Sequence, residues 1–231
     1  MQAQTVLTRY KGVRRFVRWP VAEGDIAVDP MANLEQPKPR PHPVDVLTDD
    51  EIGRLLKVTD GPDFVDRRDH AMLRVLLDCG LRISELATLT VADVDLKEHD
   101  VIRVIGKGRK VRVVPFGAKT GRALDRYRKA RPTHKHAQPR RMVAGAARRH
   151  DPRRRRHGFK VRAQQAGVDN PHAHRFRHTT AHDWLLAGGQ ERDLMRIMGW
   201  SSDAMLDRYG SSMADQRALE AHRRMRRGDR L

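Results

Sequence analysis

Residues 171–189 have the sequence PHAHRFRHTTAHDWLLAGG, which predicts a helix from His174 to Leu186 that ends at the glycine pair. His174, Arg177 and His178 fall at positions i, i+3 and i+4, so an imidazole and a guanidinium share one face of this helix. A guanidinium presents several donors in a fixed plane, which suits an oxyanion. The stretch therefore predicts a helix whose face cradles an anionic group.

The same helix also allows a second interpretation, a metal site. His174, His178 and His182 follow one another at four-residue intervals, which places three imidazoles along one side. No carboxylate or cysteine completes the set at a usual ligand spacing. The oxyanion cradle is therefore favoured, and no metal is predicted.

Another charged residue stands in an apolar setting upstream. Residues 78–95 are DCGLRISELATLTVADVD, and Arg82 lies there between two apolar residues, just beyond a predicted helix end. A half-buried arginine usually pairs with a carboxylate or faces a ligand anion. Taken alone, this segment favours an ion pair, with Glu85 as the partner.

Two short runs rich in valine and isoleucine, 100–105 and 110–115, are joined by Gly106-Lys107-Gly108-Arg109. This pattern predicts a β-hairpin with Lys107 at its tip. Lysines between glycines on turns are common and are usually just solvated, so the signal is weak by itself.

The last motif is MGWSSDAMLDRYG, residues 198–210. Trp200 follows a helix predicted at 191–198, and Tyr209 comes nine residues later, at the end of a short helix predicted at 203–209. A single tyrosine at a helix end normally has a structural role.

The rest of the chain is mostly helical in pattern. Further helices are predicted at 5–23, 46–58, 67–79, near 84, 119–130 and 213–227. The sequence QPKPRPHP, residues 36–43, has four prolines and predicts an extended linker between residues 1–35 and a larger domain, 44–231. The expected fold class is mainly α with a small β-hairpin or sheet.

Together, the motifs resemble the catalytic domain of the tyrosine recombinases, the bacteriophage integrase family that includes the Xer-like recombinases. The resemblance covers about residues 44–136 and 161–215. It consists of an arginine in a GLRxSEL block, a lysine on a GKG hairpin, an HxxR helix, a His or Trp, and a tyrosine nine residues later. The residues that it implies as catalytic are Arg82, Lys107, His174, Arg177, Trp200 and Tyr209, and those implied as DNA contacts are Arg82, Lys107, Arg109 and Arg177.

The resemblance implies cleavage and rejoining of DNA through a 3′-phosphotyrosyl intermediate. Tyr209 would attack phosphorus, Arg82 and Arg177 would bind the non-bridging oxygens, and Lys107 would protonate the leaving 5′-oxygen. His174 would assist proton movement, and Trp200 would donate a hydrogen bond while its ring packs the site. No ATP, metal or other cofactor is needed. Double-stranded DNA is the implied partner, with a homo-oligomer on that DNA and an origin in a mobile element.

Composition agrees with a nucleic-acid partner. The 231 residues carry 47 Lys and Arg against 29 Asp and Glu, a formal net charge of +18. We expect no membrane span and no signal peptide, and therefore a cytoplasmic protein. The single cysteine, Cys79, excludes a disulfide framework and is expected to be buried.

Two departures from the family pattern keep alternatives open. Residues 1–35 resemble only the last helix of the family's core-binding domain, so a truncated, inactive DNA-binding remnant is the main alternative function. A type IB topoisomerase or an RNA-binding basic protein is less favoured. Residues 137–157 are rich in arginine and almost free of large aliphatic residues. We expect this segment to be disordered or poorly packed and to come from a shifted reading frame, with a solvated basic loop that touches DNA as the alternative.

Overall fold

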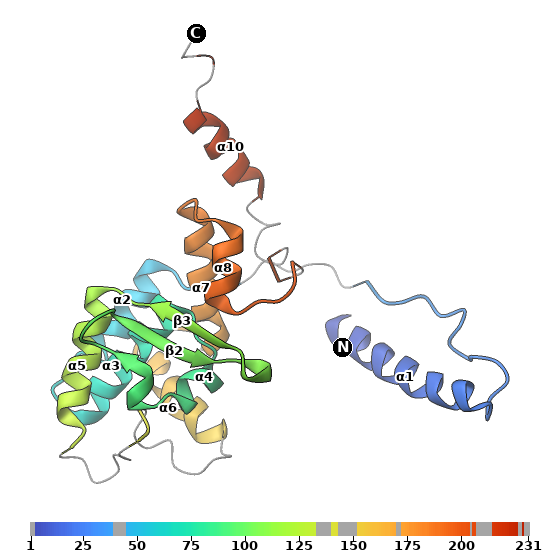
Figure 1. The fold of residues 1–231 in the computed structure, drawn as a ribbon, viewed down its shortest axis with the longest axis horizontal. Helices are drawn as coiled ribbons and strands as arrows, with labels where there is room; N and C mark the ends of the chain where they lie inside the picture. The colour runs from blue at the N-terminus through green and yellow to red at the C-terminus, as the bar shows by residue number, and fades with distance from the viewer. Residues whose placement is uncertain are drawn as a thin grey trace. The chain divides into compact units, whose positions relative to one another are not determined.

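Contacts divide the chain into two units, residues 1–43 and 44–231, which are described separately. The computed structural model describes residues 3–38, 45–132, 140–142, 152–169, 172–203, 205–206, 214–225 and 228. In the first unit, helix α1 (Ala3–Glu23) is followed by an irregular segment (Figure 1). The Tyr10 hydroxyl donates a hydrogen bond of 2.8 Å to the carbonyl of Leu34, which ties this segment to the helix.

The second unit begins with a helix whose start the sequence specifies. The Thr48 hydroxyl accepts a hydrogen bond from the backbone of Glu51, and the Glu51 carboxylate accepts one from the backbone of Thr48. This reciprocal capping satisfies two otherwise free N–H groups. The helices of this unit are α2 (Asp49–Lys57), α3 (Phe64–Cys79), α4 (Ile83–Thr88), α5 (Ala118–Ala130), α6 (Pro152–Gln165), α7 (Ala173–Leu186), α8 (Glu191–Met198) and α10 (Ala214–Met225).

The predicted hairpin forms the larger part of a three-stranded antiparallel sheet in the order β1-β2-β3. The strands are β1 (Val94–Asp95), β2 (Val101–Ile105) and β3 (Val111–Pro115). In the register, Ile102 pairs with Val114 and Val104 pairs with Arg112. Because side chains alternate along a strand, Ile102, Val104 and Val114 face the core, and Arg112 points to the same side.

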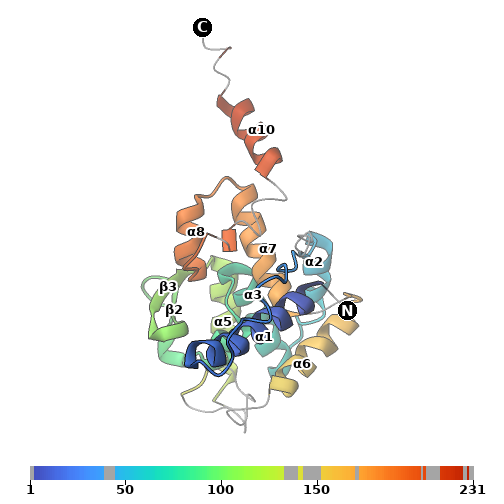
Figure 2. The ribbon, with the colours of Figure 1, turned by 90° about the vertical axis from the view of Figure 1, so that its right-hand side faces the viewer.

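Helix α3 lies at the centre of the second unit and packs against α5 and α7. Its buried residues include Leu76 and Cys79, as expected for the single cysteine. Figures 1 and 2 both show α8 next to β3, so the end of α8 comes close to the hairpin. The fold is mainly helical with a small sheet, as predicted. No helix among the described residues is long and apolar enough to cross a membrane.

The arginine-rich segment differs from the expectation at two places. Met142 is completely buried: its carbonyl accepts a hydrogen bond of 2.9 Å from the Tyr127 hydroxyl, and its N–H donates to Leu89. The expectation that residues 137–157 are disordered or poorly packed therefore does not hold at Met142. Residues 152–157 are helical and belong to α6, whereas 137–139 and 143–151 lie outside the described residues.

Two helix boundaries also differ. Helix α3 begins at Phe64, one turn before the predicted start at residue 67. Of the helix predicted at 203–209, the structure describes 205 and 206 as helical and leaves most of the remainder outside the described residues.

Candidate active site

The Arg82 backbone is held by the end of one helix and the start of the next. Helix α3 ends at Gly80, which has φ +57° and lies so close to α8 that a Cβ there would be 2.7 Å from the Met198 Cε atom. The positive φ favours glycine at this position, because other L residues adopt it only with strain. The next residue, Leu81, is completely buried, and Arg82 precedes α4 with an extended backbone. The chain therefore leaves the core at Arg82, whose side chain is 35% exposed.

Glu85 anchors the Arg82 side chain from inside the protein. Its carboxylate accepts hydrogen bonds from the Arg82 backbone N–H (2.8 Å) and from Arg82 Nη1 (3.0 Å). It also accepts two from Arg112, at 2.9 and 2.8 Å. Burial disfavours a charged carboxylate, but the hydrogen bonds and charges of the two arginines outweigh it and hold the pKa of Glu85 at about 2.

Arg112 is a member of the site that the sequence analysis missed. It lies on the core-facing side of β3, and its side chain is only 11% exposed. In addition to the two bonds to Glu85, its Nε atom donates a hydrogen bond of 2.8 Å to the carbonyl of Ile197 near the end of α8. The available signal was the strand alternation, which gives Arg112 the same parity as the buried Val114.

Arg177 joins the ends of two helices. It is 4% exposed, and its Nη1 atom donates a hydrogen bond of 2.6 Å to the carbonyl of Gly80 beyond α3. Its Nη2 atom donates to the carbonyl of Met198, the last residue of α8. Carbonyls at helix C-termini carry partial negative charge, so a guanidinium is well placed there. The guanidinium carbon also lies 5.6 Å from the centre of the Trp200 ring, close enough for a cation–π contact.

His174 lies at the exposed start of α7. Partial desolvation on its protein side, followed by the positive charges of His172, Arg177 and Arg82, lowers its pKa below 6.5. A neutral imidazole, which can either accept or donate a hydrogen bond, is therefore favoured at neutral pH. Its neighbour His172 has a different role, because the His172 Nδ1 atom accepts a hydrogen bond from the backbone of Arg175 and caps the helix.

The structure thus brings together four of the six predicted catalytic residues: Arg82, His174, Arg177 and Trp200. The Lys107 backbone belongs to a short 3₁₀ turn, Lys107–Arg109, between β2 and β3, but its side chain lies outside the described part of the chain. Tyr209 also lies outside the described residues. Arg109 is exposed on the same turn, with φ +59°.

The histidines of α7 do not form the alternative metal site in the described structure. His174 and His178 lie edge to face with ring centres 6.0 Å apart. Within the described ranges, the ligand atoms that converge belong to Asp95, Glu98 and His99, which form a solvent-facing turn after β1. Asp95 is already occupied there by the N–H groups of residues 97 and 98 and by the His99 ring.

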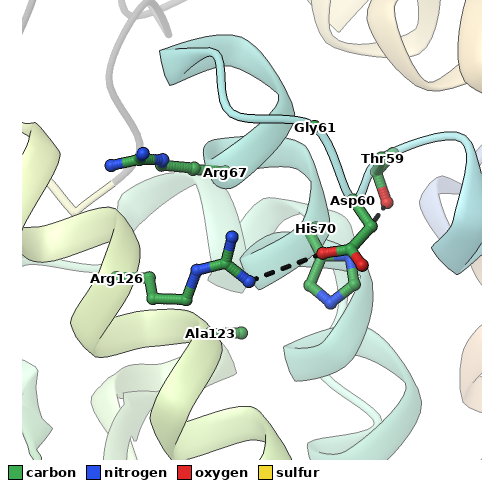
Figure 3. A pocket seen from close by; sticks show the side chains of 7 residues that line it. All are labelled: Thr59, Asp60, Gly61, Arg67, His70, Ala123 and Arg126. Carbon is green, nitrogen blue, oxygen red and sulfur yellow. Dashed lines mark hydrogen bonds and ion pairs between the residues drawn. The ribbon is translucent and has the colours of Figure 1, made fainter.

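A small pocket between α3 and α5 lies apart from these residues (Figure 3). It contains Asp60 and Arg126, which form an ion pair of 3.5 Å, and the ring of His70. The His70 Nε2 atom accepts a hydrogen bond from Arg74, and Nδ1 lies 3.3 Å from the carbonyl of Leu56. Burial and the charge of Arg74 lower the pKa of His70, so its ring is neutral and both nitrogens are engaged. Its role is structural.

Sequence comparison gives a consistent result. The Phage integrase family matches residues 45–215. The tyrosine recombinase XerC of Corynebacterium efficiens is 34% identical over 221 residues, which are 95% of this chain and 70% of that protein. The tyrosine recombinase XerD of Pseudomonas putida is 33% identical over 218 residues, 91% of this chain and 72% of that protein.

Solved structures agree with the fold. The crystal structure of XerA recombinase matches with a TM-score of 0.66 and 28% sequence identity, over 94% of this chain and 73% of that one. The Tn1549 transposon integrase in complex with a circular intermediate DNA matches with a TM-score of 0.73 and 21% identity, over 90% and 75% of the two chains. At that identity the second match concerns the fold alone.

Proposed function

The chain belongs to the phage integrase family of tyrosine recombinases, and we infer from this that it is a site-specific recombinase that cleaves and rejoins DNA. The observation that supports this site is the convergence of Arg82, Arg177 and His174. Glu85 anchors Arg82, the Gly80 carbonyl holds Arg177, and the charges of both arginines act on the His174 imidazole. A scissile phosphodiester is an anion and gains charge as a nucleophile adds, so fixed positive donors favour its transition state. Arg82 and Arg177 supply these donors in the proposed mechanism.

Tyr209 is the proposed nucleophile. Its phenolic oxygen bonds to phosphorus, the bond between phosphorus and the 5′-oxygen breaks, and a 3′-phosphotyrosyl link forms. The phenol passes its proton to solvent, with the neutral His174 imidazole as the proposed relay, and Lys107 donates a proton to the leaving 5′-oxygen. Attack by the 5′-hydroxyl of another strand reverses these changes and reseals the DNA. Because the link preserves the energy of the phosphodiester, this mechanism consumes no ATP and uses no metal or cofactor.

The two remaining residues support the phosphate. A neutral His174 donates a hydrogen bond to a phosphate oxygen or relays a proton. Trp200 is buried, and its ring packs beside the Arg177 guanidinium, which supports a role in holding that arginine in place.

The partners and the setting follow from the same proposal. The net charge of +18 supports binding to the backbone of double-stranded DNA, with Arg109 and Lys107 as further contacts. Recombination joins two duplexes, so a homo-oligomer on DNA is proposed, in a cytoplasmic protein of a mobile element. We also propose residues 1–35 as a helix of a core-binding domain, 36–43 as a linker and 44–231 as the catalytic domain. The division of contacts after Pro43 supports this arrangement.

The test is to trap a covalent adduct on a nicked suicide duplex made from the ends of the element that encodes the protein. Wild-type protein should form the adduct, and Tyr209→Phe should form none while it binds the duplex with unchanged affinity. Tyr10→Phe is the control, because Tyr10 bonds within the first unit. An adduct in Tyr209→Phe would contradict the assignment of the nucleophile. Wild-type protein that binds DNA but forms no adduct would favour the inactive remnant.

A further inference from the structure

We propose that Arg112 is a positioning residue for DNA cleavage, which acts by fixing Glu85 and, through Glu85, the guanidinium of Arg82. This inference rests on the proposed function, because it assigns a role within the same site. Arg112 need not touch the phosphate. Its effect reaches the DNA through a chain of hydrogen bonds.

The first support is the geometry around Glu85. Arg112 binds both carboxylate oxygens with its two Nη atoms, at 2.9 and 2.8 Å, which is a bidentate fork. Glu85 Oε1 is the same atom that accepts from Arg82 Nη1 at 3.0 Å. One carboxylate therefore joins the two guanidinium groups. Because Arg112 is the more buried of the pair, it fixes the carboxylate and Arg82 follows.

The second support is the position of Arg112 in the fold. It lies on β3, three residues after the turn that carries Lys107 and Arg109. Its Nε atom bonds the carbonyl of Ile197, three residues before Trp200. The tight turn at Gly199 packs on the same side chain, because a Cβ at that glycine would be 3.3 Å from Arg112 Cδ. A single guanidinium thus connects three segments that carry proposed catalytic residues.

The third support is the cost of such an arrangement. Arg112 occupies a core-facing strand position, where a valine or leucine would pack without any loss of hydration. Buried ion pairs often stabilise no more than an apolar replacement does. Among the described residues, Arg82 and Arg112 share the single carboxylate of Glu85, which leaves an excess of one positive charge in this group of three. A scissile phosphate beside Arg82 would supply the missing negative charge, which gives this costly cluster a function.

Arg112→Lys tests the proposal because it retains the charge and much of the side-chain volume. An ammonium group cannot bind both carboxylate oxygens and the Ile197 carbonyl in the planar geometry of a guanidinium. We expect the single-turnover cleavage rate on the suicide duplex to fall by about tenfold or more, since small misplacements of catalytic groups have large effects. Duplex affinity should remain within about twofold of wild type, because Arg112 is buried and need not contact the backbone.

Arg162→Lys is the matched control. Arg162 is similarly buried and binds Asp66 and Asp69, but it joins α6 to α3 rather than parts of the site. The Arg162→Lys variant should have a lower free energy of unfolding than wild type, and its folded protein should cleave DNA at the wild-type rate. An equal loss of cleavage in Arg162→Lys and Arg112→Lys would show a general packing effect and overturn the proposal.

A double-mutant cycle identifies the route. If Arg112 acts through Arg82, Arg112→Lys should slow cleavage strongly in the wild-type background and by less than about twofold in the Arg82→Lys background. Effects that multiply independently would overturn the proposal.

A measurement that needs no catalysis separates this inference from the proposed function. The Nε–H group of Arg82 gives a side-chain signal in NMR spectra, which can be assigned by its loss in Arg82→Lys. This signal should show that the Arg82 side chain is more mobile in Arg112→Lys than in wild type and is unchanged in Arg162→Lys. If wild-type protein forms no adduct, the proposed function is wrong, and this measurement still decides the role of Arg112. An Arg82 side chain that is equally ordered in wild type and Arg112→Lys would overturn the inference.

Discussion

Two clusters of arginine and carboxylate groups in the second unit look alike locally and differ in charge. The site cluster comprises Arg82, Glu85, Arg112 and Arg177, and has three guanidinium groups for one carboxylate. The second group, which we call the α6 cluster, comprises Asp66, Arg68, Asp69 and Arg162, with two groups of each sign. The four named groups of the α6 cluster sum to a formal charge of zero, whereas the four named groups of the site cluster sum to +2.

This difference separates structural from functional ion pairing. In the α6 cluster, Arg162 binds Asp66 at 2.6 Å and Asp69 at 2.9 Å; despite burial, these bonds and charges raise its pKa. Every charge there has a partner, so the cluster needs no ligand. In the site cluster, Arg177 donates hydrogen bonds to the neutral carbonyls of Gly80 and Met198. An excess of guanidinium groups over carboxylates at a partly exposed site favours the binding of an anionic substrate.

Of the substitutions that test this difference between the two clusters, Glu85→Gln should have the largest effect on stability and on cleavage. The amide retains one acceptor oxygen and turns its NH₂ group toward guanidinium donors, so bonds to Arg82 and Arg112 are lost while both charges remain. Because removing one partner of a buried ion pair leaves the other charge without compensation, we expect the free energy of unfolding to fall by about 3 kcal/mol. Urea denaturation near pH 7 measures this change. Cleavage by the folded protein should also slow. A loss below about 1 kcal/mol would show that the carboxylate is not the anchor of this cluster.

The pH dependence supplies the control for this variant. The pKa of Glu85 is about 2 in the folded protein, below its ordinary value of 4.5. Its stabilisation is therefore fully present above 4.5 and is lost as pH falls toward 2. The difference in stability between wild type and Glu85→Gln should stay constant from neutral pH to about pH 5 and narrow below that. A difference that persists unchanged near pH 3 would contradict the lowered pKa.

Asp66→Asn should have a smaller effect, and on stability alone. Arg162 loses one charged partner but keeps Asp69, so the arginine is not left without a carboxylate. We expect the free energy of unfolding to fall by about 1.5 kcal/mol, the usual value for a hydrogen bond to a charged group. The cleavage rate of the folded protein should equal that of wild type. If Asp66→Asn cleaves more slowly under conditions in which all of the protein is folded, the α6 cluster affects catalysis and is not purely structural.

The two clusters also show what the sequence could and could not predict. Local patterns predicted the hairpin and the HxxR helix, because each depends on residues a few positions apart. The pair of Arg82 and Glu85 lies three residues apart and was foreseen for the same reason. Arg112 bonds Glu85 from 27 residues away, so only the fold brings them together.

Composition alone is a poor guide to packing in the arginine-rich segment, residues 137–157. Few apolar residues there suggested that nothing would pack, yet a single methionine, Met142, fills a core position beside Tyr127. Helix α6 contributes Phe159 and Ala163 to the core and is also held by polar bonds from Arg162 to α3, while Arg54 bonds the carbonyls of Ala166 and Gly167 just after the helix. Its partners lie about a hundred residues away in the chain, beyond the reach of apolar periodicity. Whether a shifted reading frame produced residues 137–157 stays a prediction for the coding DNA.

Arg109→Asn should have the smallest effect, at a cation that belongs to neither cluster. Arg109 is exposed and has φ +59°, a left-handed conformation that is unfavourable for a long side chain and more easily adopted by asparagine. The substitution should raise the free energy of unfolding by about 0.5 kcal/mol and reduce the slope of log affinity against log salt by about 1, because one phosphate contact is lost.

Lys110→Gln is the control, since Lys110 has an ordinary φ of −68° and its change should alter only the salt slope. Urea denaturation and fluorescence anisotropy at several salt concentrations measure the two quantities. A decrease in stability for Arg109→Asn would mean that the arginine makes contacts within the protein that outweigh its backbone strain, and an unchanged salt slope would remove it from the DNA interface.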